Sequence, residues 1–369
     1  MKILVTGGAG FIGSHTVQAL VARGDEVRVL DALTQPVHEP GATPAFGEGV
    51  EFVAGDVRSR EDWLRALRDI EAVVHLGAYQ DYLTDFSKFF EVNAAGTALC
   101  YELIVAERLP VRRVVVASSQ AVYGEGCVRC SEHGVLAPGS RAMSALARAE
   151  WDVRCPRCGG RADSVPTPES AADPRNAYGI SKLAAEKIAL ALGETYGIET
   201  VALRYSIVHG PGQSPRNAYS GLLRSAALRM RAGKPPVAFE DGGQLRDYIA
   251  IDDVVSANLI ALDHRDAPGR AYNVGGGAAW TVLEAIEALA GIAGVSSEIE
   301  IPGTYRVGDV RNIVSDIGLL RSLGWDPATD LKDVWTRYWD WLEEIKPEEH
   351  AVDDAFARMH AEGVLRDVT

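Results

Sequence analysis

Ser119, Tyr178 and Lys182 have the side chains needed to move a proton where a hydride leaves carbon. Tyr178 and Lys182 are one helical turn apart, so both face one side of a predicted helix. The ammonium of Lys182 favours the phenolate of Tyr178, whose free pKa is about 10, and the phenolate can then act as a base on a hydroxyl. Ser119, at the end of a predicted strand, can hydrogen-bond the reacting oxygen. A Tyr-x-x-x-Lys pair also occurs by chance on surfaces, but this context favours a redox site.

A glycine loop near the N-terminus predicts a dinucleotide site. Gly7, Gly10 and Gly13 follow a short apolar strand and open a helix, where backbone N–H groups can face a pyrophosphate. Asp31 ends the second predicted strand, and a carboxylate there binds the ribose diol and repels a 2′-phosphate. We therefore predict NAD rather than NADP. The alternative, a tight turn without a ligand, accounts for the glycines but not for Asp31.

Two Cys-x-x-Cys pairs between Ser119 and Tyr178 predict a structural zinc site. The four thiolates of Cys127, Cys130, Cys155 and Cys158 would close a tetrahedral shell, which leaves no position for substrate. His133 is the less favoured ligand because the thiolates already suffice. Two disulfides or spare thiols are the alternatives, and a reducing compartment disfavours the first.

Alternating strands and helices must position these groups, and they predict an α/β fold with a doubly wound parallel sheet. The predicted strands are 2–6, 26–30, 50–54, 72–76, 113–117 and 200–204, with helices at 14–22, 61–69, 94–108 and 176–196. We expect a Rossmann domain over 1–205 with a zinc-ribbon-like insertion at 125–172, a smaller substrate-binding domain over 206–345 with segments returning to the Rossmann core, and a tail at 346–369. The tail is either a docking helix or a frayed end. In the smaller domain we expect a helix at 217–232 and strands near 237–240 and 271–274.

Composition restricts the partners. With 369 residues and a net charge of −14, the chain repels phosphate backbones, so nucleic acid is not an expected partner. No apolar run approaches the roughly 20 residues that cross a bilayer, and the chain starts directly on the glycine-loop strand. We therefore expect a cytoplasmic protein with no membrane partner.

Several motifs together resemble the extended short-chain dehydrogenase/reductase family of nucleotide-sugar epimerases and dehydratases. They are the Gly-x-x-Gly-x-x-Gly spacing, Gly55-Asp56-Val57, His75-Leu76-Gly77-Ala78 and Asn93-Ala94-Ala95-Gly96-Thr97. The resemblance spans about residues 1–345. It implies a homodimer formed through the helices at 94–108 and 176–196. It also implies that Phe11, Ile12, Asp56, Val57, Leu76, Gly77, Ala78, Asn93, Tyr178 and Lys182 join the three glycines and Asp31 in binding NAD.

The same resemblance separates the possible reactions. Dehydratases of the family carry an Asp-Glu pair after the catalytic Ser or Thr, whereas this chain has Gln120 and Ala121. The resemblance therefore implies C4 epimerisation through a transient ketone. The insertion, the Ser119–Gly126 run and Arg204-Tyr205-Ser206-Ile207-Val208 resemble a subgroup that includes dTDP-L-rhamnose 4-epimerases. A UDP-hexose 4-epimerase, a 4-ketoreductase and a non-catalytic nucleotide-sensing regulator remain open.

Substrate contacts follow from the matched positions. Arg246 and Arg306 match arginines that hold the diphosphate, which suits a planar guanidinium. Ile207 replaces an Asn that commonly contacts substrate, which argues against the standard UDP-galactose pose. The remaining candidates for the nucleotide diphosphate-sugar are Tyr79, Gln80, Gln120, Asn217 and Tyr219.

Overall fold

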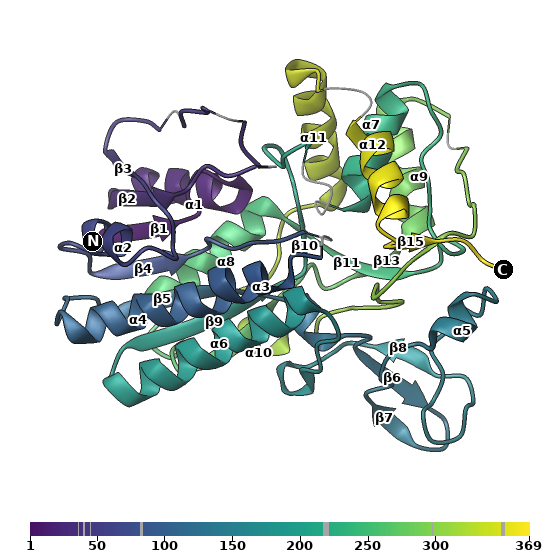
Figure 1. Ribbon diagram of the computed structural model, residues 1–369, viewed down its shortest axis with the longest axis horizontal. Helices are drawn as coiled ribbons and strands as arrows, with labels where there is room; N and C mark the ends of the chain where they lie inside the picture. The colour runs from purple at the N-terminus through teal and green to yellow at the C-terminus, as the bar shows by residue number, and fades with distance from the viewer. Residues whose placement is uncertain are drawn as a thin grey trace.

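A seven-stranded parallel sheet forms the centre of the computed structural model, which describes residues 1–35, 37–39, 41–44, 46–81, 84–216, 221–296, 298–347 and 351–369 (Figure 1). Its strand order is β12-β9-β5-β4-β1-β2-β3, and every neighbouring pair is parallel. The strands are β1 (Lys2–Thr6), β2 (Glu26–Asp31), β3 (Val50–Ala54), β4 (Ala72–His75), β5 (Arg113–Ser119), β9 (Glu199–Tyr205) and β12 (Arg270–Val274). The six strands predicted from the sequence are confirmed.

Helices cover both faces of this sheet. One face packs on α1 (Phe11–Ala22), α8 (Ile251–Asp263) and α10 (Gly318–Arg321), and the other on α2 (Arg60–Ala66), α4 (Gly96–Ala106) and α6 (Ala177–Tyr196). Successive residues of β1 separate the two cores, because Ile3 and Val5 belong to one apolar cluster and Leu4 to the other. The predicted doubly wound Rossmann architecture is therefore confirmed.

One apolar helical stretch runs from Phe86 to Ala106, through α3 (Phe86–Phe89), a π-helical turn η1 (Phe90–Ala95) and α4. It has 21 residues, and an 18-residue window within it has a mean hydropathy of 1.3 and is 50% buried in the protein. Cys100, Leu103 and Ile104 pack under the sheet, and α4 lies beside α6. Burial in the core accounts for the apolar character of this stretch.

A second, smaller core lies on the C-terminal side. Its three-stranded sheet has the order β10-β11-β13, with strands Ile207–His209, Leu245–Ala250 and Ala279–Thr281. The helices α7 (Leu222–Arg231), α9 (Val282–Ala293) and α11 (Leu331–Ile345) pack together around Trp335 and Tyr338. The strand expected near 271–274 is β12, at the edge of the large sheet. The strand expected near 237–240 is reduced to a bridge between Val237 and Glu300.

The insertion forms its own small antiparallel sheet, which projects from the lower right of Figure 1. The order is β7-β6-β8, with strands Gly134–Leu136, Cys127–Cys130 and Asp163–Val165, and α5 (Met143–Leu146) follows β7. Two short 3-10 turns, η2 (Gln120–Tyr123) and η3 (Glu169–Ala171), flank it. The insertion therefore follows the predicted catalytic Ser119 in sequence, with only η2 between them.

The tail is docked on the smaller core. Helix α12 (Ala351–Ala361) buries Val352 and Met359, and β15 (Leu365–Arg366) pairs antiparallel with β14 (Tyr305–Arg306). The C-terminal Thr369 donates its backbone N–H to Ala147 O of the insertion at 2.9 Å. Of the two expectations for the tail, the structure supports a docking segment.

Candidate active site

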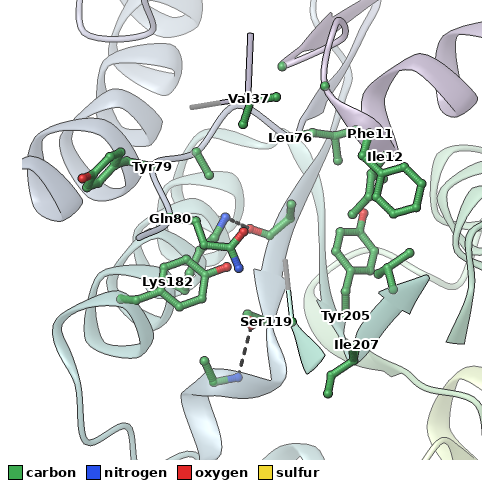
Figure 2. Close-up of a pocket in the computed structure, with 18 of the residues that line it drawn as sticks. Phe11, Ile12, Val37, Leu76, Tyr79, Gln80, Ser119, Lys182, Tyr205 and Ile207 are labelled. Atoms are coloured by element: carbon green, nitrogen blue, oxygen red, sulfur yellow. Dashed lines mark hydrogen bonds between the residues drawn. The ribbon is translucent and has the colours of Figure 1, made fainter. Parts of the chain in front are cut away.

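A cavity of about 500 Å³ opens at the carboxyl ends of the parallel strands. Its walls include the glycine loop after β1, Asp31 at the end of β2, Leu76 after β4 and Ser119 at the end of β5. Figure 2 shows Ser119 and Lys182 facing the cavity from one side, with Tyr205 and Ile207 opposite. Ligands of open α/β sheets bind at this edge, so the predicted residues converge where a dinucleotide can lie.

The glycine loop and Asp31 are joined directly. The Asp31 carboxylate accepts the Ala9 N–H at 3.0 Å and the Leu33 N–H at 2.9 Å, while the residue still lines the cavity. At Gly13 a Cβ would lie 2.1 Å from Gly7 O, so only glycine lets α1 start this close to the loop. The tight cradle beside a carboxylate fits the pyrophosphate and ribose of NAD.

Nearly all the predicted cofactor residues line this cavity. They are Gly7, Gly10, Phe11, Ile12, Gly13, Asp31, Asp56, Val57, Leu76, Gly77, Ala78, Tyr178 and Lys182. Asn93 lies one layer behind the wall. Its side-chain oxygen accepts the Tyr79 backbone N–H, and its side-chain nitrogen donates to the Tyr79 carbonyl and, at 2.9 Å, to Ser181 Oγ. The motif predicted that Asn93 binds NAD, and in the structure its hydrogen bonds support the Tyr79 segment of the cavity wall.

The three predicted catalytic side chains meet in the cavity. Ser119, Tyr178 and Lys182 all line it, and Lys182 Nζ donates to Ala117 O at 2.9 Å. Burial raises the pKa of Tyr178 to about 12, and hydrogen bonding to the Ser119 side chain opposes that rise. Burial lowers the pKa of Lys182 to about 8, so its amine is charged below about pH 8. Within the protein alone the phenol is therefore neutral at pH 7.

Helix α6 is held against the Ser119 segment by two local features. Asn176 caps the helix by accepting the Gly179 N–H at 2.8 Å. A Cβ on Gly179 would lie 2.4 Å from Ala121 O, so glycine permits this close approach. The first turn of α6 consequently brings Tyr178 to the end of β5, although 58 residues separate Ser119 from Tyr178.

Gln120 and Glu125 show which acid–base groups the site has beyond this trio. Gln120 lines the cavity, and its buried Oε1 has no hydrogen-bond partner among the described residues. Glu125 is the first acid after Ser119, but its carboxylate accepts Arg141 Nε at 2.9 Å and the Arg311 N–H at 2.6 Å. Among the described residues that line the cavity, the acids are Asp31, Asp56 and Asp309. None of these three acids lies next to Ser119 in sequence, where the resembling dehydratases carry their Asp-Glu pair.

The two predicted diphosphate arginines lie together at the other end of the cavity. Arg306 Nη2 is 3.1 Å and Arg246 Nη2 is 3.5 Å from Asp309 Oδ2. Arg246 also donates to the carbonyls of Leu245, Val310 and Arg311. Burial raises the pKa of Asp309, but nearby guanidinium groups hold it below its ordinary value. Arg246 thus shapes the loop that carries Arg306 and Asp309.

The remaining substrate candidates divide into two groups. Tyr79 and Gln80 line the cavity, and the Tyr79 hydroxyl donates to Asp85 Oδ2 at 2.7 Å. Asn217 and Tyr219 lie outside the described residues. Sequence reasoning missed Phe239 and Gln244, which line the arginine end. Their position just before Arg246 was the available signal.

A second group of ligating atoms gathers in the insertion, and it differs from the predicted one. Cys130, His133, Cys155 and Cys158 place one ligand atom each within 4.8 Å of one another. Cys127 is not in this group. Strand β6 alternates its side chains, so Cys127 and Cys130, three residues apart, point to opposite faces. The backbone N–H of Cys127 instead donates to the Thr167 hydroxyl oxygen at 2.9 Å, and burial raises the pKa of the Cys127 thiol.

Three of the distances within this group match a tetrahedral metal site. Cys130 Sγ lies 3.7 Å from Cys158 Sγ and 3.6 Å from His133 Nδ1, and Cys155 Sγ lies 3.6 Å from the same nitrogen. Four such ligands around zinc, with Zn–S near 2.3 Å and Zn–N near 2.0 Å, lie about 3.6 to 3.8 Å apart. The spacing Cys130-x-x-His133, across the turn after β6, was the signal for the histidine.

Comparisons with known proteins agree with this geometry. The family described as "NAD dependent epimerase/dehydratase family" matches residues 3–142 and 157–275. A dTDP-L-rhamnose 4-epimerase of Burkholderia thailandensis is 33% identical over 342 residues, which cover 90% of this chain and 92% of that protein. The structure of Thermotoga maritima UDP-glucose 4-epimerase with UDP-glucose is 27% identical, with a TM-score of 0.75 and coverage of 94% and 100%. That of Thermus thermophilus UDP-glucose 4-epimerase with NAD is 31% identical, with a TM-score of 0.72 and coverage of 93% and 99%.

Proposed function

We propose a reaction and substrate for this chain, which belongs to the NAD-dependent epimerase/dehydratase family and is a nucleotide-sugar epimerase. It inverts C4 of a dTDP-6-deoxyhexose such as dTDP-L-rhamnose. One observation carries the proposal. Ser119, Tyr178 and Lys182 share a cavity with the glycine loop, and no described acid in its lining is next to Ser119 in sequence. The site can therefore exchange a proton at one oxygen but lacks the extra acid–base pair for elimination.

Tyr178, Ser119 and Lys182 have separate roles in proton transfer at the C4 hydroxyl. When bound, NAD supplies the chemistry of taking a hydride from C4 and returning it to the opposite face. Tyr178 accepts the proton of the C4 hydroxyl as the ketone forms, and returns it on reduction. Ser119 holds the C4 oxygen in both directions. The ammonium of Lys182, together with the positive nicotinamide, opposes the burial that keeps the phenol neutral.

Ile207 supports a 6-deoxy substrate. It lines the cavity with an apolar side chain at a position where the resembling proteins commonly carry Asn (Figure 2). A C6 methyl group gains from such a surface, whereas a C6 hydroxyl loses a hydrogen-bond partner there. The UDP-hexose 4-epimerases among the similar structures keep that substrate class as the second candidate.

A panel of dTDP-, UDP- and GDP-sugars tests the function directly. We expect purified protein to equilibrate dTDP-L-rhamnose with its C4 epimer, followed by NMR, without added reduced cofactor. Stoichiometric consumption of reduced cofactor would instead identify a 4-ketoreductase. Turnover confined to UDP-hexoses would replace the dTDP-sugar assignment, and absence of turnover on the panel with intact nucleotide binding would favour a regulator.

A structural zinc ion completes the proposal, held by Cys130, His133, Cys155 and Cys158. The four ligand atoms would fill the shell of a tetrahedral ion, which would leave it no open position for substrate. The Cys155–Cys158 pair forms a tight turn closed by the Gly159 N–H on Cys155 O at 2.8 Å. The ion would stabilise the insertion by joining its two turns.

Metal content distinguishes this ligand set from four cysteines. We expect about one zinc per chain in the wild type and in Cys127→Ser, and less than about half in Cys130→Ser and His133→Ala. Cys127→Ser is the matched control because it changes the same residue type on the same strand. Loss of zinc in Cys127→Ser with retention in His133→Ala would restore the four-cysteine set.

We also propose a homodimer through α4 and α6, with α3 beside them. Phe86 and Ile180 are 58% and 44% exposed on this side, and α3 packs against α6. Apolar side chains exposed together on neighbouring helices favour association. Sedimentation equilibrium of the full chain measures the mass directly.

A further inference from the structure

We infer that Arg141 of the insertion is a positioning residue for the nucleotide end of the cavity, an inference that rests on the proposed function. Arg141 does not line the cavity. Its side chain is only 5% exposed, and it links three segments that meet behind the Arg306 end. The insertion would thereby influence substrate affinity without touching substrate.

Every nitrogen of the Arg141 guanidinium is used. Nε binds Glu125 Oε1 at 2.9 Å, and Nη1 donates to Trp151 O at 3.1 Å. Nη2 lies 2.9 Å from Glu240 Oε1 and donates to Asp309 O at 3.1 Å. A planar fork with five donors can satisfy such a set, whereas a lysine ammonium cannot span it.

Two of these contacts hold cavity-lining loops. The Asp309 carbonyl belongs to the loop whose carboxylate pairs with Arg306 and Arg246. Glu240 directly follows Phe239, which lines the cavity under the Arg306 guanidinium at 5.7 Å. Because the bonds converge on one side chain, a shift of Arg141 moves both loops.

Glu240 has a backbone conformation that its ion pairs with Arg141 and Arg311 help to maintain. Its φ is +55°, in the left-handed region that a non-glycine residue enters at a cost. The side chain is 3% exposed and is paired with both Arg141 and Arg311. The two guanidinium groups offset the cost of the backbone conformation and of burying the carboxylate.

Arg141 lies in an excursion of the insertion, residues 134–154, that is anchored at both of its ends. Cys130 and His133 lie before residues 134–154, and Cys155 and Cys158 follow them, so the ligand group closes this loop. Leu146 and Trp151 of the excursion form a buried cluster with Tyr305, the residue before Arg306. Closing a loop reduces its conformational freedom, which keeps Arg141 in one position.

Binding and kinetics of Arg141→Met test the inference. We expect KM for the dTDP-sugar and Kd for dTDP, by calorimetry, to rise at least about tenfold, with kcat changed less than about threefold. NAD content should stay at the wild-type level, since the four described hydrogen-bonding partners of Arg141 lie outside the cofactor loops. Arg148→Met is the matched control: Arg148 lies in the same excursion, is 58% exposed and should leave both constants unchanged.

The outcomes separate the inference from the proposed function. Unchanged Kd and KM in Arg141→Met would overturn the positioning role, as would a fall in kcat with constant KM. If Arg141→Met fails to fold, Arg141→Lys keeps a charge beside Glu125 and Glu240 but loses the carbonyl contacts, and the same rise in Kd is expected. If the wild type binds neither dTDP nor UDP, it is the proposed function that fails.

Discussion

Tyr178→Phe is expected to lower kcat for C4 inversion by a factor on the order of 10³ or more. The substitution removes one oxygen from a buried ring and leaves the apolar packing, so the fold should persist. With no phenolic oxygen, no group at that position can take the proton while the hydride leaves. NMR rates at saturating substrate, with NAD content measured on the same sample, check the prediction.

The control for this variant lies on the same helix. Tyr196 ends α6 and is 54% exposed, so Tyr196→Phe makes the same chemical change far from the cavity and should leave kcat unchanged. Wild-type turnover in Tyr178→Phe would remove Tyr178 as the base. A loss of NAD alongside turnover would instead indicate that the phenol holds the cofactor.

Gly13→Ala is expected to destabilise the protein by about 3 kcal/mol or more and to abolish NAD binding. The new methyl group would lie 2.1 Å from Gly7 O and 2.7 Å from Gly8 Cα. Both are backbone atoms of the cradle, so they can yield only if the loop leaves α1. Thermal unfolding and calorimetric titration with NAD measure the two effects.

Gly291→Ala makes the same substitution in another helix. Gly291 lies in α9 with nothing within 4 Å of the new methyl group, so we expect stabilisation of about 0.5 to 1 kcal/mol and unchanged NAD binding. Equal effects of the two substitutions would show that helix propensity, and not the close approach, decides the outcome at Gly13.

The combined geometry explains why the insertion interrupts the catalytic segment. It leaves the chain immediately after η2 and returns just before α6, so both of its ends adjoin Ser119 and Tyr178. Its middle reaches across to Asp309 and Glu240 through Arg141. One insertion thereby contacts the scaffold at the reacting end and at the nucleotide end of the same cavity.

The sequence by itself determined the architecture and predicted which residues form the reaction centre. The period of the apolar residues specified the six strands and the helices between them, because a buried parallel strand and an amphipathic helix leave different patterns. Gly7, Gly10 and Gly13, Asp31, and the Tyr178–Lys182 pair were also readable, since each depends on spacing within one local element. All of them line the cavity.

Only the tertiary structure decided the contacts made across elements. The pattern of two Cys-x-x-Cys pairs suggested four equivalent thiolates, but pairing of β6 with β8 turns Cys127 toward Thr167 and leaves His133 with the other three. Likewise, no local signal links Arg141 to Glu240 or Asp309, which lie far along the chain. Periodicity records which face a residue occupies, whereas a side chain's partner depends on which distant segment packs against that face.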